Sequence, residues 1–174
     1  MLPVDILISR FIEIFVSLPG FLLILSIIAI MKSPNLYVVM AIIGATSWTG
    51  IARLIRGELL RVRNLEYIEA AQSLGYSEWR IMFRHAIPNA LTSVLISIAF
   101  GVASAILTES ALSFLGIGVQ ADVVTWGKLL NEARNEVSAW WFAVFPGFAI
   151  FLTVTIFNLL GDGLNEALDP RLKQ

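Results

Sequence analysis

Residues 86–108 read AIPNALTSVLISIAFGVASAILT, which is 23 consecutive positions without a charged side chain. A bilayer hydrocarbon core about 30 Å thick is crossed by roughly 17–25 mainly apolar residues in helical conformation. Three other uncharged stretches have suitable lengths: residues 14–31, 36–52 and 137–161. Because these stretches lack the period-2 alternation of membrane barrel strands, the sequence predicts an all-α membrane protein with four transmembrane helices.

The composition fits a chain whose main solvent is lipid. Of its 174 residues, 57% are hydrophobic and 14% are charged, whereas soluble domains have roughly 25% charged residues. Buried core helices of a soluble all-α protein are the alternative, but such helices usually carry a polar face. The chain has no cysteine and one histidine, which excludes disulfides and sites built from several His and Cys ligands.

Positive charge is concentrated between the second and third predicted spans. Six of the twelve Lys and Arg residues lie there: Arg53, Arg56, Arg61, Arg63, Arg80 and Arg84. Short connections rich in Lys and Arg remain in the cytoplasm, so this connection is predicted to be cytoplasmic. The turn after the first predicted span has only Lys32, whereas the N-terminal side has Arg10 and the C-terminal tail has Arg171 and Lys173. Both termini are therefore also predicted to be cytoplasmic. Trp126, Trp140 and Trp141 fit an outer interfacial belt, although simple packing is also open to them.

The cytoplasmic connection reads NLEYIEAAQSLGYSEWRIMFRHAIPN over residues 64–89. A short helix is predicted over residues 65–75, because its apolar residues recur at helical spacing. These are Leu65, Ile68, Ala71 and Leu74. Gly75 is expected at the C′ position with positive φ, and Ser77 is expected to be the N-cap of a second short helix. Pro88 lies near the start of the next span, where its missing N–H costs little.

This helical pair is too short to span the bilayer and is predicted to be a docking element. Glu69 offers a carboxylate to an arginine or to backbone amides of a partner. Ala70 and Ala71 are small enough to allow close approach of a partner's backbone. A surface helix lying among lipid headgroups is the alternative that these residues leave open, since basic amphipathic segments also bind there.

Several motifs in this order resemble a known family. Glu69-Ala70-Ala71, then Gly75, then His85-Ala86-Ile87-Pro88 is similar to the EAA-loop signature of permease subunits of ATP-binding-cassette importers. Other segments resemble the C-type membrane subunit of the dipeptide, oligopeptide and nickel importers. They are EWRIMFRHAIPN at 78–89, ESALSFLGIG at 109–118, Trp126-Gly127, NLLGDGL at 158–164 and ALDP at 167–170. Arg10, Glu13, Leu18 and Pro19 are similar to the cytoplasmic entry of a permease span, where a Leu-Pro kink follows.

The resemblance implies a type I importer permease fold over residues 1–174, with residues 65–75 as the coupling helix that enters a groove of a cytoplasmic ATPase subunit. The implied coupling residues are Glu69, Ala70, Ala71, Gly75 and Pro88. ATP and Mg²⁺ would be bound by the partner ATPase subunits, and the chain, which has no Gly-x-x-x-x-Gly-Lys-Ser/Thr loop, is not expected to be an enzyme. Other implied partners are a homologous second permease subunit, an extracytoplasmic solute-binding protein and the lipid bilayer; no nucleic acid is expected.

The implied activity is import of peptides, nickel or related small solutes across a bacterial or archaeal plasma membrane. Ser97, Ser104 and Thr108 are candidate path-lining residues because they share one side of the third span; small polar residues also pack helices together in lipid. Family members usually have six spans, so the chain is expected to be the C-terminal portion of such a subunit. Residues 119–122 lack the proline pair that the family often carries.

Two other function classes are possible from the spans alone. A passive membrane scaffold or channel subunit accounts for the spans but not for the cytoplasmic helical pair. An intramembrane hydrolase needs a nucleophile with a base inside the bilayer, and the predicted spans hold no Ser/His or Asp/Asp pair of that kind. Glu13 and Glu109 border spans and are interpreted as interfacial pairing or packing residues. Asp162 is expected to be structural or to touch the ATPase.

Overall fold

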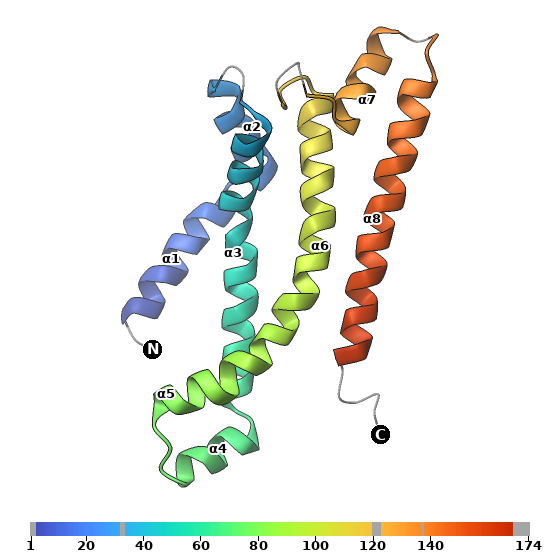
Figure 1. Cartoon of the computed structure of the whole chain (residues 1–174). Helices are drawn as coiled ribbons and strands as arrows, with labels where there is room; N and C mark the ends of the chain where they lie inside the picture. Colours follow the sequence, from blue (N-terminus) through green and yellow to red (C-terminus); the bar gives the residue numbers. More distant parts are fainter. Residues whose placement is uncertain (1–2, 32–33, 120–122, 137, 169–174) are drawn as a thin grey trace. The chain divides into compact units, whose positions relative to one another are not determined.

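The computed structural model describes residues 3–31, 34–119, 123–136 and 138–168, and every element in these ranges is helical (Figure 1). The helices are α1 Pro3–Ser17, α2 Gly20–Ile30, α3 Leu36–Arg63, α4 Glu66–Ser73, α5 Glu78–Ile81, the π-helix η1 Met82–Ala86, α6 Ile87–Phe114, α7 Trp126–Asn135 and α8 Trp141–Leu168. The predicted all-α fold is confirmed. Some residues used in the sequence predictions lie outside the described ranges: Lys32, residues 120–122, Val137, Asp169, Pro170, Arg171 and Lys173.

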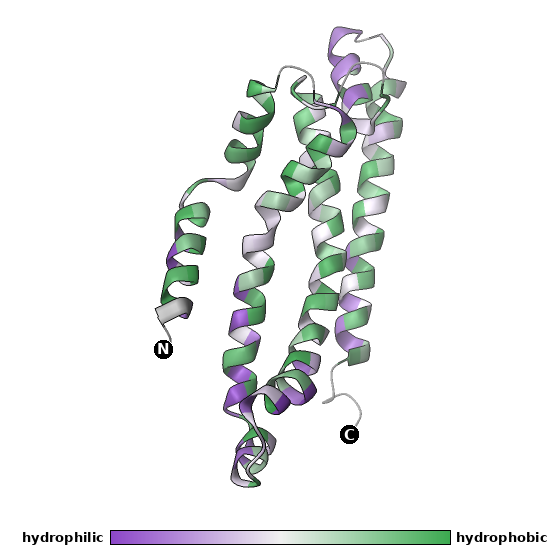
Figure 2. Cartoon of the chain, turned by 60° about the vertical axis from the view of Figure 1, so that its left-hand side comes forward, coloured by the Kyte–Doolittle hydropathy of each residue, from purple (hydrophilic) through white to green (hydrophobic). Residues whose placement is uncertain are grey.

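Three helices are long and apolar enough to cross a membrane: α3, the continuous helix Glu78–Phe114, and α8. The pair α1 and α2 qualifies as a fourth span only if its two helices are counted together. Figure 2 shows hydrophobic residues along most of α2, α6 and α8, and hydrophilic residues on the last turns of α3 and on α7. The apolar stretches found in the sequence therefore mark the parts of these helices that suit a bilayer.

The prediction of one helix over residues 14–31 is corrected. α1 ends at Ser17 and α2 begins at Gly20, and the two helices are bent by 76° at this break. Pro19 lies at the break with φ −58° and ψ 114°, and its carbonyl begins α2 by accepting from the N–H of Leu23 at 3.0 Å. Proline has no N–H and disfavours the α conformation in the residue before it, so an uncharged stretch need not be one helix.

The other predicted spans agree in place and differ in length. α3 begins at Leu36 as expected but continues past residue 52 through Arg53 to Arg63. α6 and α8 likewise run beyond residues 108 and 161, and α8 begins at Trp141 rather than at residue 137. A helix does not end where the membrane ends, because its backbone hydrogen bonds are formed within the segment in either solvent.

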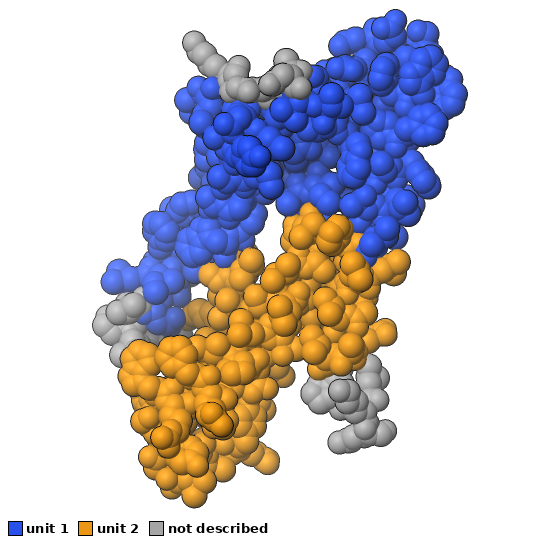
Figure 3. All heavy atoms as spheres, in the orientation of Figure 1, with its two compact units in different colours: residues 1–49, 103–156 blue, residues 50–102, 157–174 orange. Residues whose placement is uncertain are grey.

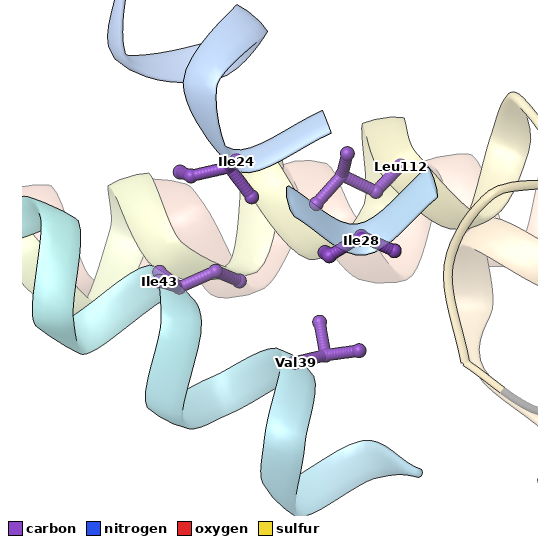
Figure 4. Packing of buried hydrophobic residues seen from close by; sticks show 5 residues of the cluster. All are labelled: Ile24, Ile28, Val39, Ile43 and Leu112. Atoms are coloured by element: carbon purple, nitrogen blue, oxygen red, sulfur yellow. The ribbon is translucent and has the colours of Figure 1, made fainter. Parts of the chain in front are cut away.

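The chain divides into two compact units, which Figure 3 shows in different colours. The first comprises residues 1–49 and 103–156, and the second comprises residues 50–102 and 157–174. Five buried side chains form the core of the first unit (Figure 4): Ile24 and Ile28 of α2, Val39 and Ile43 of α3, and Leu112 of α6. The spacing of four places each pair on one face of its helix. In lipid such contacts stabilise through van der Waals packing rather than removal of apolar surface from water.

Candidate functional site

The candidate site is the helical hairpin between α3 and α6, which lies within the second unit. The chain leaves α3 through a turn in which the N–H of Leu65 donates to the Val62 carbonyl at 3.1 Å. Leu65 is then the extended N-cap of α4, and its carbonyl accepts from the N–H groups of Ile68 and Glu69 at 2.9 and 3.3 Å. Glu66 and Glu69 lie in the first turn, where a carboxylate is favoured by the positive end of the helix dipole.

α4 ends in a Schellman motif, which confirms the prediction for Gly75. The N–H of Gly75 donates to the Gln72 carbonyl at 2.9 Å, and the N–H of Tyr76 donates to the Ala71 carbonyl at 3.2 Å. Gly75 has φ +78°, a conformation that costs other L-residues free energy because their Cβ meets the backbone. The helix therefore stops at a glycine, and the chain reverses direction.

The second helix of the hairpin begins as predicted. The Ser77 hydroxyl accepts from the N–H of Arg80 at 3.4 Å and caps α5. α5 passes directly into η1, where the backbone widens to π-helical bonding before α6. Pro88 follows in the first turn of α6 and has no N–H to give to the Arg84 carbonyl, while the Asn89 side chain donates to the His85 carbonyl at 2.7 Å.

The hairpin has a small core of its own. Val62 of α3, Ile68 and Ala71 of α4 and Ile81 of α5 are buried together, with Leu65 and Ala86 packed against them. The predicted apolar face of α4 is thus mostly inward, although Leu74 is exposed. This core joins the end of α3, the whole of α4 and the beginning of the helix that becomes α6. A force applied to α4 would therefore reach both long helices.

The core divides the predicted coupling residues between two faces. Ala71 is buried between the helices of the hairpin, so its small side chain allows α4 and α5 to approach each other. Glu69 and Ala70 of α4 are exposed, and so is Gly75 in the turn that ends it. Pro88 is also exposed but belongs to α6, beyond the hairpin.

Two further motifs meet in the first unit. The segment at 109–118 forms the end of α6, and the Trp126-Gly127 pair begins α7. A Cβ built on Gly127 would lie 2.7 Å from the Ser110 Cα and 2.8 Å from the Ser113 Cβ. Only glycine fits this contact, so α7 lies directly on the last turns of α6.

Polar contacts add to this junction between α6 and α7. The Asn131 side chain donates to the Phe114 carbonyl at 2.6 Å, and the Arg134 guanidinium lies 5.4 Å from the centre of the Phe114 ring. Glu109, which borders the span, accepts from the Ser113 hydroxyl at 2.7 Å. Neither α7 nor this junction was predicted from the sequence, although the glycines and serines of both motifs were the available signal.

Comparison with known proteins identifies the family at this point. Residues 2–174 match the family model of the binding-protein-dependent transport system inner membrane component. The chain belongs to this family. The expected resemblance to importer permeases is thereby confirmed, and the family description is that of a transport component, in line with the expectation that the chain is not itself an enzyme.

Curated relatives of this inner membrane component are named as peptide transport permeases. The chain is 45% identical to a glutathione transport system permease protein of Pectobacterium atrosepticum over 170 residues, 97% of this chain and 56% of the relative. It is 36% identical to a dipeptide transport system permease protein of Bacillus subtilis, over 98% of this chain and 54% of the relative. A dipeptide transport system permease protein of Alkalihalophilus pseudofirmus is 40% identical over 98% of this chain and 56% of the relative. The chain spans about half the length of the curated relatives it matches.

The candidate path residues of this inner membrane component lie along α6. The hydroxyl of Ser97 donates to the Val94 carbonyl at 2.8 Å, and that of Thr108 donates to the Ser104 carbonyl at 2.8 Å. The Ser97 and Thr108 hydroxyls are thus satisfied within α6, which suits both a lining and a packing role. The prediction that Ser97, Ser104 and Thr108 line a path therefore remains a prediction.

Other charged residues near the predicted spans lie at the protein surface. Arg10 and Glu13 form an exposed ion pair at 2.7 Å on α1, and such pairs contribute little to stability. Asp162 is exposed in the last turns of α8. Among the described residues, no group of three His, Cys, Asp or Glu side chains is arranged to hold a metal ion.

Proposed function

We propose that this chain is a transmembrane subunit of an ATP-driven importer that carries peptides, nickel or related small solutes. Membership of the transport family supports the transporter class. The relatives named for glutathione and dipeptide transport support a peptide substrate. The observation that supports the coupling role is the packing of the hairpin, which exposes Glu69 and Ala70 on α4 while its inner face joins α3 to α6.

In the proposed mechanism, α4 enters a groove on a cytoplasmic ATPase subunit. The Glu69 carboxylate accepts hydrogen bonds from an arginine or from backbone amides of that subunit. When the ATPase subunits close on ATP and Mg²⁺, they carry α4 with them, and the shared core formed by Val62, Ile68 and Ile81 moves α3 and α6 together. The spans would then open a path on one side of the membrane and close it on the other.

We also propose a location and further partners for the chain. The hairpin and both termini would lie on the cytoplasmic side of the inner membrane. The basic residues between the second and third spans support this orientation: Arg53, Arg56, Arg61, Arg63, Arg80 and Arg84. A homologous second permease subunit would supply the other half of the path. An extracytoplasmic solute-binding protein would deliver the solute, since the family is described as dependent on one.

The experiment that tests the coupling role is co-purification of the chain with ATPase activity in mild detergent. Glu69→Lys reverses the exposed carboxylate, and Gly75→Leu places a branched side chain at φ +78°. Loss of one partner of a buried, hydrogen-bonded charge pair costs about 2–5 kcal/mol, which lowers affinity by about 30-fold or more. Glu69→Lys should therefore lose the ATPase. Gly75→Leu should also lose it, because a branched side chain strains the turn that ends α4. Both variants should still insert into the membrane.

The matched control is Glu166→Lys, which makes the same charge change at an exposed position near the end of α8. It should retain the ATPase. If the chain recruits no ATPase even when completed with the preceding part of a curated relative, the coupling role is refuted and a membrane scaffold or channel subunit becomes the better interpretation.

A further inference from the structure

The hairpin carries a second exposed surface that the coupling role does not use. Trp79 of α5 and Phe83 of η1 stack with ring centres 5.8 Å apart and planes 9° from parallel. They are nevertheless 69% and 60% exposed. Two large aromatic rings ordered against each other and left open to the surroundings indicate a surface that contacts something apolar.

The direction of this surface follows from helical geometry. Residues 79 and 83 lie four positions apart and therefore share a face, whereas Ile81 lies between them and on the opposite face. Ile81 is buried in the hairpin core against Ile68 and Ala71 of α4. The two rings thus point away from α4, and away from the surface that carries Glu69.

α5 continues through η1 into α6 as one helix over Glu78–Phe114. Figure 1 shows this helix rising at a slant from α5, with α4 below α5. The face opposite α4 is therefore the face on the side of the spans. Phe83 lies three residues before the uncharged stretch 86–108, which is about 4.5 Å along a helix. Because each headgroup region is about 5–7 Å deep, this distance places Phe83 at the depth of the headgroups.

The charge around the rings matches a lipid surface. Arg80 and Arg84 are exposed beside the aromatic face, and the Arg80 guanidinium lies 5.4 Å from the centre of the Tyr76 ring. Tryptophan is favoured at the boundary between acyl chains and headgroups, and nearby arginines attract anionic phospholipids. An aromatic pair flanked by two cations is the chemistry of an interfacial anchor.

We propose that Trp79 and Phe83 insert into the headgroup boundary of the cytoplasmic leaflet, and that Arg80 and Arg84 bind anionic phospholipid headgroups there. This anchor holds α5 against the bilayer while the opposite face of the hairpin remains free for α4 to engage a partner. It depends on the span that follows Ala86 but not on recruitment of an ATPase.

The test uses a chain in which Trp79 is the single tryptophan, made with the substitutions Trp48→Phe, Trp126→Phe, Trp140→Phe and Trp141→Phe. The chain is reconstituted into vesicles of phosphatidylcholine and phosphatidylglycerol, and its helix content is checked by circular dichroism. Bromine near the headgroup end of the acyl chains should quench Trp79 fluorescence more than bromine near the chain terminus, and aqueous iodide should quench it weakly. Strong quenching by iodide without quenching by brominated lipid would overturn the proposal, because the ring would then face water.

A matched control moves the probe to the other end of the hairpin. With Trp79→Phe and Leu74→Trp in the same background, the tryptophan replaces an exposed residue at the end of α4. It should be quenched by iodide and not by brominated lipid. Equal quenching of both probes by brominated lipid would also overturn the proposal, because the hairpin would then lack a distinct lipid-facing side.

The arginines are tested separately. Brominated phosphatidylglycerol should quench Trp79 more strongly than brominated phosphatidylcholine at the same bromine content, and Arg80→Gln with Arg84→Gln should remove this excess. If the excess is absent from the unaltered anchor, the assignment of an anionic headgroup site is overturned. Co-purification of the ATPase is a separate measurement, so a failure of the anchor is distinguishable from a failure of the coupling role.

Discussion

Replacement of Gly75 by alanine tests whether the turn of the hairpin depends on backbone conformation alone. The residue has φ +78°, and a Cβ added there would meet nothing within 4 Å. The alanine side chain should therefore meet no neighbour. The only cost should be that of holding an L-residue in the left-handed conformation, which destabilises the turn by about 1–2 kcal/mol. That free energy corresponds to an increase of about 5–30-fold in the population of the open turn.

Amide hydrogen exchange in detergent or nanodiscs measures this opening directly. The N–H groups of residue 75 and Tyr76 are the donors of the Schellman motif, so their exchange should accelerate by that factor in Gly75→Ala. Gly75→Asn should accelerate it less, because asparagine tolerates the left-handed region better. Gly57→Ala, an open helical position in α3, is the control and should leave these two amides unchanged. Unchanged exchange in Gly75→Ala would refute the assignment of strain to this turn.

The remaining predictions concern packing. Gly127→Ala forces a Cβ against the Ser110 backbone and should destabilise by about 1–3 kcal/mol, lowering the thermal unfolding midpoint in detergent. Gly161→Ala should lower the midpoint less, because its Cβ would lie 2.8 Å from the Phe100 ring, and a ring at the end of a side chain can turn aside. Equal lowering by the two variants would contradict this difference. Ile68→Ala empties part of the hairpin core, where Ile68 is 2% exposed, and should cost about 2–5 kcal/mol. Limited proteolysis within residues 64–89 should then accelerate, and resistance equal to the unaltered chain would contradict the packing.

Local signals allowed the helical hairpin to be predicted closely. Gly75 and Ser77 act through their own backbone and the few residues beside them, so a short window of sequence contains the information that their conformations require. The apolar stretches also predicted where membrane-crossing helices lie, because hydrophobicity depends on composition and not on packing.

Other features could not be predicted by counting uncharged residues, because they depend on backbone conformation or on contacts between helices. Pro19 divides residues 14–31 into two helices through its backbone alone, although it carries no charge. Ala71 is buried because it packs with Ile81, ten residues further along the chain. The sequence pattern of α4 alone could not show whether the Ala71 side chain faces inward or outward. The contact of Gly127 with Ser110 likewise joins residues from different helices, so two separately noted motifs proved to be one packed junction.

The hairpin is proposed to face the cytoplasm, where it can transmit the movement of an ATPase to the spans. The chain has no cysteine, so Ser73→Cys, at an exposed position of α4, supplies a single reactive thiol. A membrane-impermeant maleimide should leave it unlabelled in intact cells and label it after the membrane is opened. Labelling from outside intact cells would mean that the hairpin faces outward, where it could not meet a cytoplasmic ATPase.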